Sequence, residues 1–159
     1  MDESDQREPD GIYAKSKREA ELRILEISQK SGMNVVIIRP SLVYGKGMKG
    51  NLNLMFSGIK NGWFPPLPKI NNRRSMIHVD DLVEALLMVS INKSAYGKIF
   101  NITDGYPYSS REIYEAMCIS LGKKIPRWGF PVWILICISK LSKGFSYKIN
   151  KLIGDEWYS

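Results

Sequence analysis

The sequence predicts an α/β fold, and three observations support this class. A long amphipathic helical pattern is followed at once by a short, wholly apolar run, which is typical of a helix leading into a buried strand. A second strand pattern later in the chain has helical patterns on both sides, and such alternation is typical of layered α/β domains. The chain has 159 residues, 44% of them hydrophobic, so we expect one domain or pieces of two.

The first part of the chain predicts a helix, a strand and a loop. Apolar residues recur at helical spacing from Tyr13 to Lys30 among lysine, arginine and glutamate. Val35–Ile38 contains no polar residue, which predicts a strand covered on both faces, as in a parallel sheet. Ser41–Asn51 contains three glycines and is expected to be a loop leaving the carboxyl end of that strand, where open α/β sheets bind ligands.

Five further elements are expected before Gly122. In chain order they are a helix, a strand, a helix, a strand and a helix: Leu52–Asn61, Asn71–Val79, Leu82–Ser90, Lys98–Ile102 and Ser109–Leu121. Asp80 and Asp81 are expected to cap the second of these helices, and Ser109 and Glu112 have capping-box spacing for the third. The apolar segment Trp128–Leu141 predicts a C-terminal helix packed in the core, with docking on a membrane surface as the alternative.

Charge and cysteine content argue against several functions. The net charge is +7, but the basic residues are dispersed and no nucleic-acid-binding motif occurs, so we expect no nucleic-acid partner. The longest apolar run is shorter than the roughly 20 residues that span a bilayer. Cys118 and Cys137 lie in apolar helical patterns, which predicts buried, reduced thiols in a cytoplasmic protein without a metal site. The acidic first ten residues predict no signal peptide.

Tyr13 and Lys17 form the candidate catalytic pair. Residues four apart share one face of a helix, so the phenol and the ammonium group are expected to point the same way. A neighbouring ammonium group favours the phenolate, and such a tyrosine can exchange a proton with a sugar hydroxyl while hydride moves the other way. The spacing alone is also that of an ordinary surface pair. Of the other candidates, His78 is expected to be structural and Tyr44 to be a loop residue that partly covers the core.

Several sequence blocks together resemble the C-terminal half of the extended short-chain dehydrogenase/reductases. In chain order they are YAKSK, VVIIRP, SLVYG with the following KG, NNRRSMIHVDDLVEAL and GKIFNITDG. More narrowly, they resemble the NAD-dependent epimerase/dehydratase family, which acts on nucleotide sugars. The resemblance implies a Rossmann-like fold with a small substrate-binding α/β region. Residues 1–45 would be the last helix and strand of the dinucleotide-binding domain, and residues 46–159 mainly the substrate-binding region, interleaved with Rossmann-like elements.

The resemblance also implies roles for five residues. Tyr13 matches the catalytic acid/base of the family, and Lys17 matches the lysine that stabilises the phenolate and holds the nicotinamide ribose. Pro40 matches the proline beside the nicotinamide. Arg74 matches the arginine that reaches the substrate diphosphate, and Asn51 lies where the substrate loop contacts the nucleotide sugar. The implied cofactor is NAD, with NADP possible, and complete members usually form homodimers through a helix pair that includes the tyrosine helix.

The activity implied is that of a UDP-hexose or UDP-N-acetylhexosamine 4-epimerase in envelope polysaccharide biosynthesis. The alternatives are an NAD(P)H-dependent 4-keto-sugar reductase and a non-catalytic remnant or interaction module. Galactose epimerases carry asparagine where Leu42 lies, which argues against a plain UDP-galactose enzyme. The glycine-rich dinucleotide turn of the family is absent, and so is its substrate-binding serine or threonine. We therefore expect a fragment, a truncation or a degraded gene product that is inactive alone.

Overall fold

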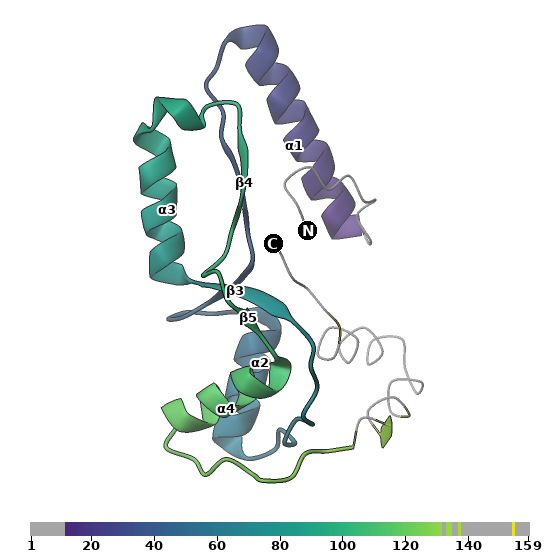
Figure 1. The fold of residues 1–159 in the computed structure, drawn as a ribbon. Helices are drawn as coiled ribbons and strands as arrows, with labels where there is room; N and C mark the ends of the chain where they lie inside the picture. The colour runs from purple at the N-terminus through teal and green to yellow at the C-terminus, as the bar shows by residue number, and fades with distance from the viewer. Residues whose placement is uncertain (1–11, 132, 135–136, 138–153, 155–159) are drawn as a thin grey trace.

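The computed structural model describes residues 12–131, 133–134, 137 and 154, and every structural statement below refers to these residues. Helices and strands alternate along the chain, which confirms the α/β class (Figure 1). The helices are α1 (Ile12–Ser31), α2 (Gly50–Asn61), α3 (Val79–Ile91), the short 3₁₀ helix η1 (Lys93–Ala95) and α4 (Ser110–Ser120). The strands are β1 (Ile37–Pro40), β2 (Leu42–Tyr44), β3 (Arg74–His78), β4 (Ile99–Ile102) and β5 (Pro107–Tyr108).

The strands form two small sheets that lie one after the other along the molecule. β1 and β4 run parallel, with Ile37 opposite Ile99 and Pro40 opposite Ile102. In the second sheet the order is β2-β3-β5, where β2 is parallel and β5 antiparallel to β3. Figure 1 shows α1 and α3 on either side of the β1·β4 pair, and α2 and α4 together beyond the second sheet.

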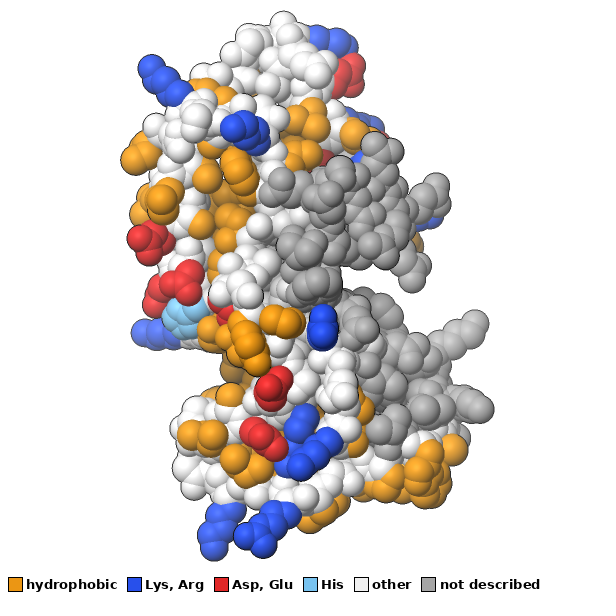
Figure 2. All heavy atoms as spheres, in the orientation of Figure 1, with side chains coloured by type: hydrophobic (Ala, Val, Ile, Leu, Met, Phe, Trp, Pro, Cys, Tyr) orange, Lys and Arg blue, Asp and Glu red, His pale blue; other side chains and the backbone are white. Residues whose placement is uncertain are grey.

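The main core lies between α2, α4 and β3. Its buried residues come mostly from the facing sides of the two helices: Leu52, Met55, Ile59, Leu67, Met76, Ile113, Tyr114, Met117 and Cys118. α1 and α3, in contrast, contain no buried residue. Leu87 and Ile91 of α3 are 64% and 83% exposed, and Figure 2 shows hydrophobic side chains gathered over this part of the surface.

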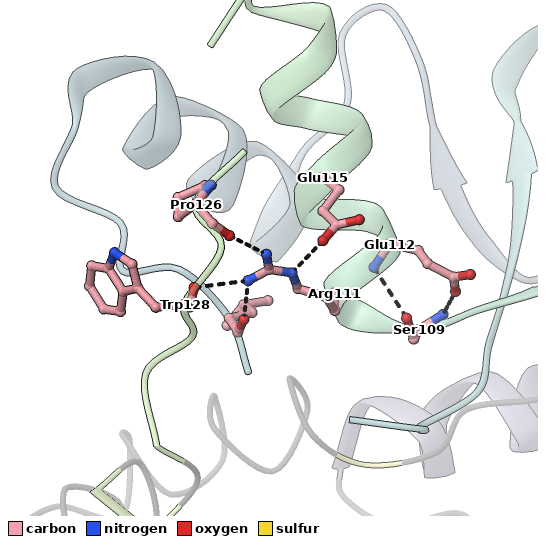
Figure 3. A network of polar contacts seen from close by, with 7 residues as sticks. Ser109, Arg111, Glu112, Glu115, Pro126 and Trp128 are labelled. Carbon is pink, nitrogen blue, oxygen red and sulfur yellow. Dashed lines mark hydrogen bonds and ion pairs between the residues drawn. The ribbon is translucent and has the colours of Figure 1, made fainter. Parts of the chain in front are cut away.

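The start of α4 follows the sequence prediction. The Ser109 side chain accepts a hydrogen bond from the Glu112 N–H at 3.1 Å, and the Glu112 carboxylate accepts one from the Ser109 N–H at 2.7 Å (Figure 3). This is the predicted capping box. The helix patterns that predicted α1, α2 and α3 are likewise confirmed, each to within three residues at either end.

Two predictions near the first strand were wrong in their bounds. β1 begins and ends two residues later than Val35–Ile38, because pairing with β4 fixes its ends. Its exposure rises from a buried Ile37 to an exposed Pro40, so the strand is not covered throughout. Ser41–Asn51 is not a loop over its whole length, since Leu42–Tyr44 pair with β3 and α2 already begins at Gly50.

Other corrections concern the cap of α3 and the C-terminal part. His78, not Asp80, is the N-cap, and its side chain accepts a hydrogen bond from the Asp80 N–H at 3.3 Å. Cys118 is buried as predicted, whereas Cys137 is exposed; both are free thiols. Half of the predicted helix over Trp128–Leu141 lies outside the described residues, and the described Trp128 is 61% exposed.

Candidate active site

Tyr13 and Lys17 lie on the first two turns of α1. The Lys17 Nζ lies over the Tyr13 ring, 5.6 Å from its centroid, so the two side chains do share one face of the helix. Tyr13 is 76% exposed, and its carbonyl accepts a hydrogen bond from Ser16 Oγ at 2.8 Å. The phenol is therefore open to a ligand approaching the start of α1.

Pro40 ends β1 and lies opposite the last residue of β4. In Figure 1 this carboxyl end of the parallel pair and the first turn of α1 point toward the same end of the layer. The next residue, Ser41, donates its backbone N–H to the Ile102 carbonyl at 3.0 Å. Pro40 thus lies where parallel α/β sheets bind ligands.

Two buried polar atoms at the same place were not identified from the sequence. Ser41 Oγ and Asn101 Oδ1 are buried, and neither has a hydrogen-bond partner among the described residues. Ser41 directly follows β1, and Asn101 is the third residue of β4. Buried polar atoms normally have partners, so an unpaired one at a strand end indicates a place for a ligand group. Polar residues at the carboxyl end of each apolar run were the available signal.

Arg74 and Asn51 lie in the second part of the molecule. Arg74 opens β3, is 8% exposed and lies opposite Tyr108 of β5. Its neighbour Arg73 is exposed. Asn51 is exposed in the first turn of α2, where the free N–H groups of a helix attract acceptor groups.

Titratable aromatic residues gather around the ends of β2 and β5. Burial, followed by the charges of Asp104 and Asp81, raises the pKa of Tyr44 above its usual value. Burial and a hydrogen bond with Asp104 raise the pKa of Tyr108 to about 12. Tyr44 also meets the His78 ring edge to face, with 5.1 Å between centroids. These phenols stay neutral at ordinary pH. Tyr44 partly covers the core as predicted, but it is the last residue of β2 and not a loop residue. His78 has a structural role as the N-cap of α3.

A groove of about 690 Å³ opens between α2, α4 and the glycine loop after β2. Its walls include Tyr44, Phe56 and Tyr108, and its lining is mainly apolar. None of the five predicted site residues belongs to that lining. The described residues contain no cluster of three or more His, Cys, Asp or Glu side chains that could hold a metal ion. None of the described helices has the length and apolar character required to cross a membrane.

Together, parallel strands, the Tyr13–Lys17 helix and polar groups at the strand ends define an α/β protein of the Rossmann-like class. The chain matches the family described as "NAD dependent epimerase/dehydratase family" over residues 1–103. It belongs to this family, which confirms the resemblance inferred from the sequence blocks.

Curated relatives agree with this assignment. The UDP-glucose 4-epimerase of Vibrio cholerae is 33% identical over 153 residues, which cover 94% of this chain and 46% of the relative. The N-acetyl-alpha-D-glucosaminyl-diphospho-ditrans,octacis-undecaprenol 4-epimerase of Escherichia coli O157:H7 is 29% identical over 159 residues, covering 95% of this chain and 48% of the relative. The chain therefore spans about half the length of these relatives.

Solved structures confirm the fold. The dTDP-glucose 4,6-dehydratase from Bacillus anthracis, in complex with NAD, superposes with a TM-score of 0.65 and 26% identity, covering 77% of this chain and 40% of that one. The UDP-N-acetylglucosamine 4-epimerase from Bacillus cereus gives a TM-score of 0.66 with 20% identity, covering 78% of this chain and 44% of that one. The described helices and strands thus correspond to part of a larger epimerase/dehydratase fold.

Proposed function

We propose that this chain supplies the substrate side of an NAD-dependent nucleotide-sugar 4-epimerase acting on a UDP-hexose or UDP-N-acetylhexosamine. The observation that carries the proposal is the contact between Lys17 and Tyr13 on an exposed helix turn, in a chain that belongs to the epimerase/dehydratase family. Two relatives that bear 4-epimerase names support the choice of reaction. The second of these names includes a lipid diphosphate sugar, which supports a role in envelope polysaccharide synthesis.

In this proposal Tyr13 is the acid/base residue. Its phenolate oxygen removes the proton of the sugar C4 hydroxyl and later returns that proton to the 4-keto oxygen. The Lys17 Nζ lies 5.6 Å from the Tyr13 ring centroid, so a positive charge is placed beside the side chain that exchanges the proton. NAD would supply reversible hydride transfer at C4 of the sugar, with Pro40, Ser41 and Asn101 holding its nicotinamide group. The substrate and product are isomers, so no cofactor is consumed.

The cofactor and the diphosphate are assigned to separate groups of residues. Ser41 Oγ and Asn101 Oδ1, buried at the carboxyl end of β1 and β4, fit the polar edge of a bound nicotinamide group beside Pro40. Arg74 is assigned to the diphosphate, because a guanidinium group matches phosphate oxygens in geometry and charge. Asn51 is assigned to the nucleotide sugar. Residues 1–45 then belong to the dinucleotide-binding part and residues 46–159 mainly to the substrate-binding part.

The test is an epimerisation assay on an enzyme that contains this chain, with UDP-hexoses and UDP-N-acetylhexosamines as substrates. Replacing the acid/base residue, Tyr13→Phe, should lower kcat by about a hundredfold or more. Tyr106→Phe is the matched control, because Tyr106 is an exposed tyrosine far along the chain from Tyr13. Unchanged turnover in Tyr13→Phe contradicts the proposal. Net oxidation of NADH or NADPH with each product formed would assign the reductase activity instead.

A homodimer formed through α1 is part of the proposal. α1 has 20 residues and none of them is buried, and Leu22 and Ile27 are 55% and 52% exposed. An amphipathic helix with this much uncovered apolar surface needs a partner surface. Sedimentation of Leu22→Lys and Ile27→Lys variants should give monomers, and dimers that persist would contradict the assignment.

The free thiol of Cys118 fits a reducing compartment such as the cytoplasm.

A further inference from the structure

The register between β3 and β5 continues beyond the ends of the two strands. Arg74 lies opposite Tyr108, and Ser75 opposite Pro107. Two residues further out in the same antiparallel register, Asn72 comes to lie opposite Ser110. These two residues are hydrogen-bonded to each other although both lie outside the ladder, and Ser110 is already the first residue of α4.

The Asn72 side chain takes the place of a backbone partner in this added pair. Its Oδ1 accepts a hydrogen bond from the Ser110 N–H at 3.0 Å, and its Nδ2 donates one to Ser110 Oγ at 3.0 Å. A carboxamide has the same donor and acceptor as a peptide group, so it can close such a pair in both directions. It also satisfies one of the N–H groups at the start of α4 that lack a partner within the helix.

Both partners are well buried, so the pair is shielded from competition with water. Asn72 is 7% and Ser110 only 2% exposed. Asn72 Nδ2 also donates to the Gly154 carbonyl at 3.2 Å. The ladder between β3 and β5 contains only two residue pairs, which is a short stretch for fixing register. The Asn72–Ser110 pair therefore has a large part in fixing the position of β3 relative to α4.

The next residue of α4 holds the same segment at a second point. Arg111 donates from its guanidinium group to the Leu67 carbonyl at 2.6 Å. Leu67 and Asn72 both belong to the irregular segment that connects α2 to β3 and ends immediately before Arg74. The first two residues of α4 thus fix this segment near its middle and near its end.

From these contacts we propose that Asn72 and Ser110 are positioning residues that set Arg74 for the substrate diphosphate. The inference rests on the proposed function, because that function assigns the diphosphate to Arg74. Neither residue needs to touch the substrate. Asn72 and Ser110 hold the start of β3 in one register. This register fixes the backbone of the buried Arg74 and so the position from which its guanidinium group reaches the diphosphate.

The test compares the binding of UDP and uridine to the 159-residue chain by isothermal titration calorimetry. The uridine dissociation constant divided by the UDP dissociation constant isolates the diphosphate contribution from that of the nucleoside. Arg74→Gln should lower this ratio about tenfold or more, as expected for loss of a charge-assisted hydrogen bond. Asn72→Ala should lower it roughly three- to tenfold while uridine affinity stays within about twofold.

Ser109→Ala is the matched control. It removes the N-cap of the same helix and so destabilises the chain, but it leaves both Asn72–Ser110 hydrogen bonds in place. Its uridine-to-UDP ratio of dissociation constants should stay at the level of the unaltered chain. A ratio that falls equally in Ser109→Ala and Asn72→Ala means that the effect does not depend on the Asn72–Ser110 hydrogen bonds, and it overturns the inference.

Ser110→Pro is a second variant, which removes both the N–H donor and the Oγ acceptor of Ser110 while keeping the helix. Proline is well tolerated at the first helical position, and Ser109 has the extended ψ of 155° that a following proline requires. This variant should show the same lowered ratio as Asn72→Ala. In both variants the backbone amides of β3 and the Tyr108 amide of β5 should exchange hydrogen faster than in Ser109→Ala, a readout that needs no ligand.

The outcomes distinguish the positioning role of Asn72 and Ser110 from the proposed function. If Arg74→Gln loses the diphosphate contribution and Asn72→Ala keeps it, the positioning role is wrong and the proposed function stands. If Arg74→Gln keeps it, or UDP binds no better than uridine, the proposed function is wrong at this site. In that event unchanged hydrogen exchange in Asn72→Ala would also remove the positioning role.

Discussion

Arg111 offers the sharpest test of how the second part of the molecule is held together. Its side chain is nearly buried, at 6% exposure, and it connects α4 to two loops (Figure 3). The guanidinium group donates to the carbonyls of Leu67 at 2.6 Å, Pro126 at 2.5 Å and Trp128 at 3.3 Å. It also donates to the Glu115 carboxylate at 2.6 Å. Arg111→Met keeps most of the apolar stem but removes all four contacts.

The expected loss can be estimated from these contacts. Removing a buried charged partner from such a network costs roughly 3–5 kcal/mol of unfolding free energy. A domain is stable by about 5–15 kcal/mol, so the variant should lose a large share of its stability. Glu115 is one-third exposed, so Glu115→Gln should cost no more than about 1 kcal/mol. The difference between the two variants reports on the three carbonyl contacts together with the contact between the guanidinium group and the Tyr114 ring.

Urea denaturation at 25 °C, followed by circular dichroism, measures both variants against the unaltered chain. The midpoint should fall strongly for Arg111→Met and only slightly for Glu115→Gln, with unchanged slopes. Arg111→Lys should lie between them, because a single ammonium group cannot reach carbonyls on separate segments as a planar guanidinium group does. A loss below about 1 kcal/mol in Arg111→Met, or an equal loss in Glu115→Gln, would refute this account of the network.

Three further predictions follow from particular contacts. Burial and a hydrogen bond with Cys118 raise the pKa of Tyr114 to about 12, so this residue stabilises the fold fully below pH 10 and loses that contribution as pH rises toward 12. Tyr114→Phe should remove roughly 2–3 kcal/mol of that alkaline loss in a pH series of urea titrations. A methyl group on Gly129 would lie 2.6 Å from the Leu67 carbonyl oxygen. Gly129→Ala should therefore lower the melting temperature by an amount equivalent to about 1–3 kcal/mol. An unchanged melting temperature would contradict this close packing of Gly129 against Leu67. Glu21 accepts from Arg39 Nη2 at 2.7 Å, and Glu21→Gln should speed hydrogen exchange in α1 more than in α4.

The helices were predictable from sequence because each presents several turns of periodic pattern. α1 and α4 also carry local signals for their ends, namely Gly32 after the first and the Ser109–Glu112 box before the second. β2 and β5 have three and two residues, too few for a period of two to show, and they exist only because β3 lies between them. His78 displaced Asp80 as the N-cap because β3 runs up to His78 and leaves no room for a turn between strand and helix.

The site was predictable only where spacing along one element was sufficient. Tyr13 and Lys17 share a helix face by their separation alone, and their contact is confirmed; their catalytic roles stay predictions. Asn72 could not be found this way, because its importance depends on a register between segments almost forty residues apart. Ser41 and Asn101 likewise could not be grouped from the sequence, because only the pairing of β1 with β4 brings their two strands together.

The parallel β1·β4 pair has a consequence for how this chain behaves in solution. The two strands share one row of hydrogen bonds, and no further strand pairs with either outer side within the described residues. Peptide groups along those outer sides can pair with any extended segment that approaches, including one from another copy. The yield of soluble protein on refolding should therefore fall as protein concentration rises, even at a temperature where the folded chain is stable. A lysine placed at Ile38 or Phe100 should lessen that dependence, since charged residues on open strands discourage such pairing.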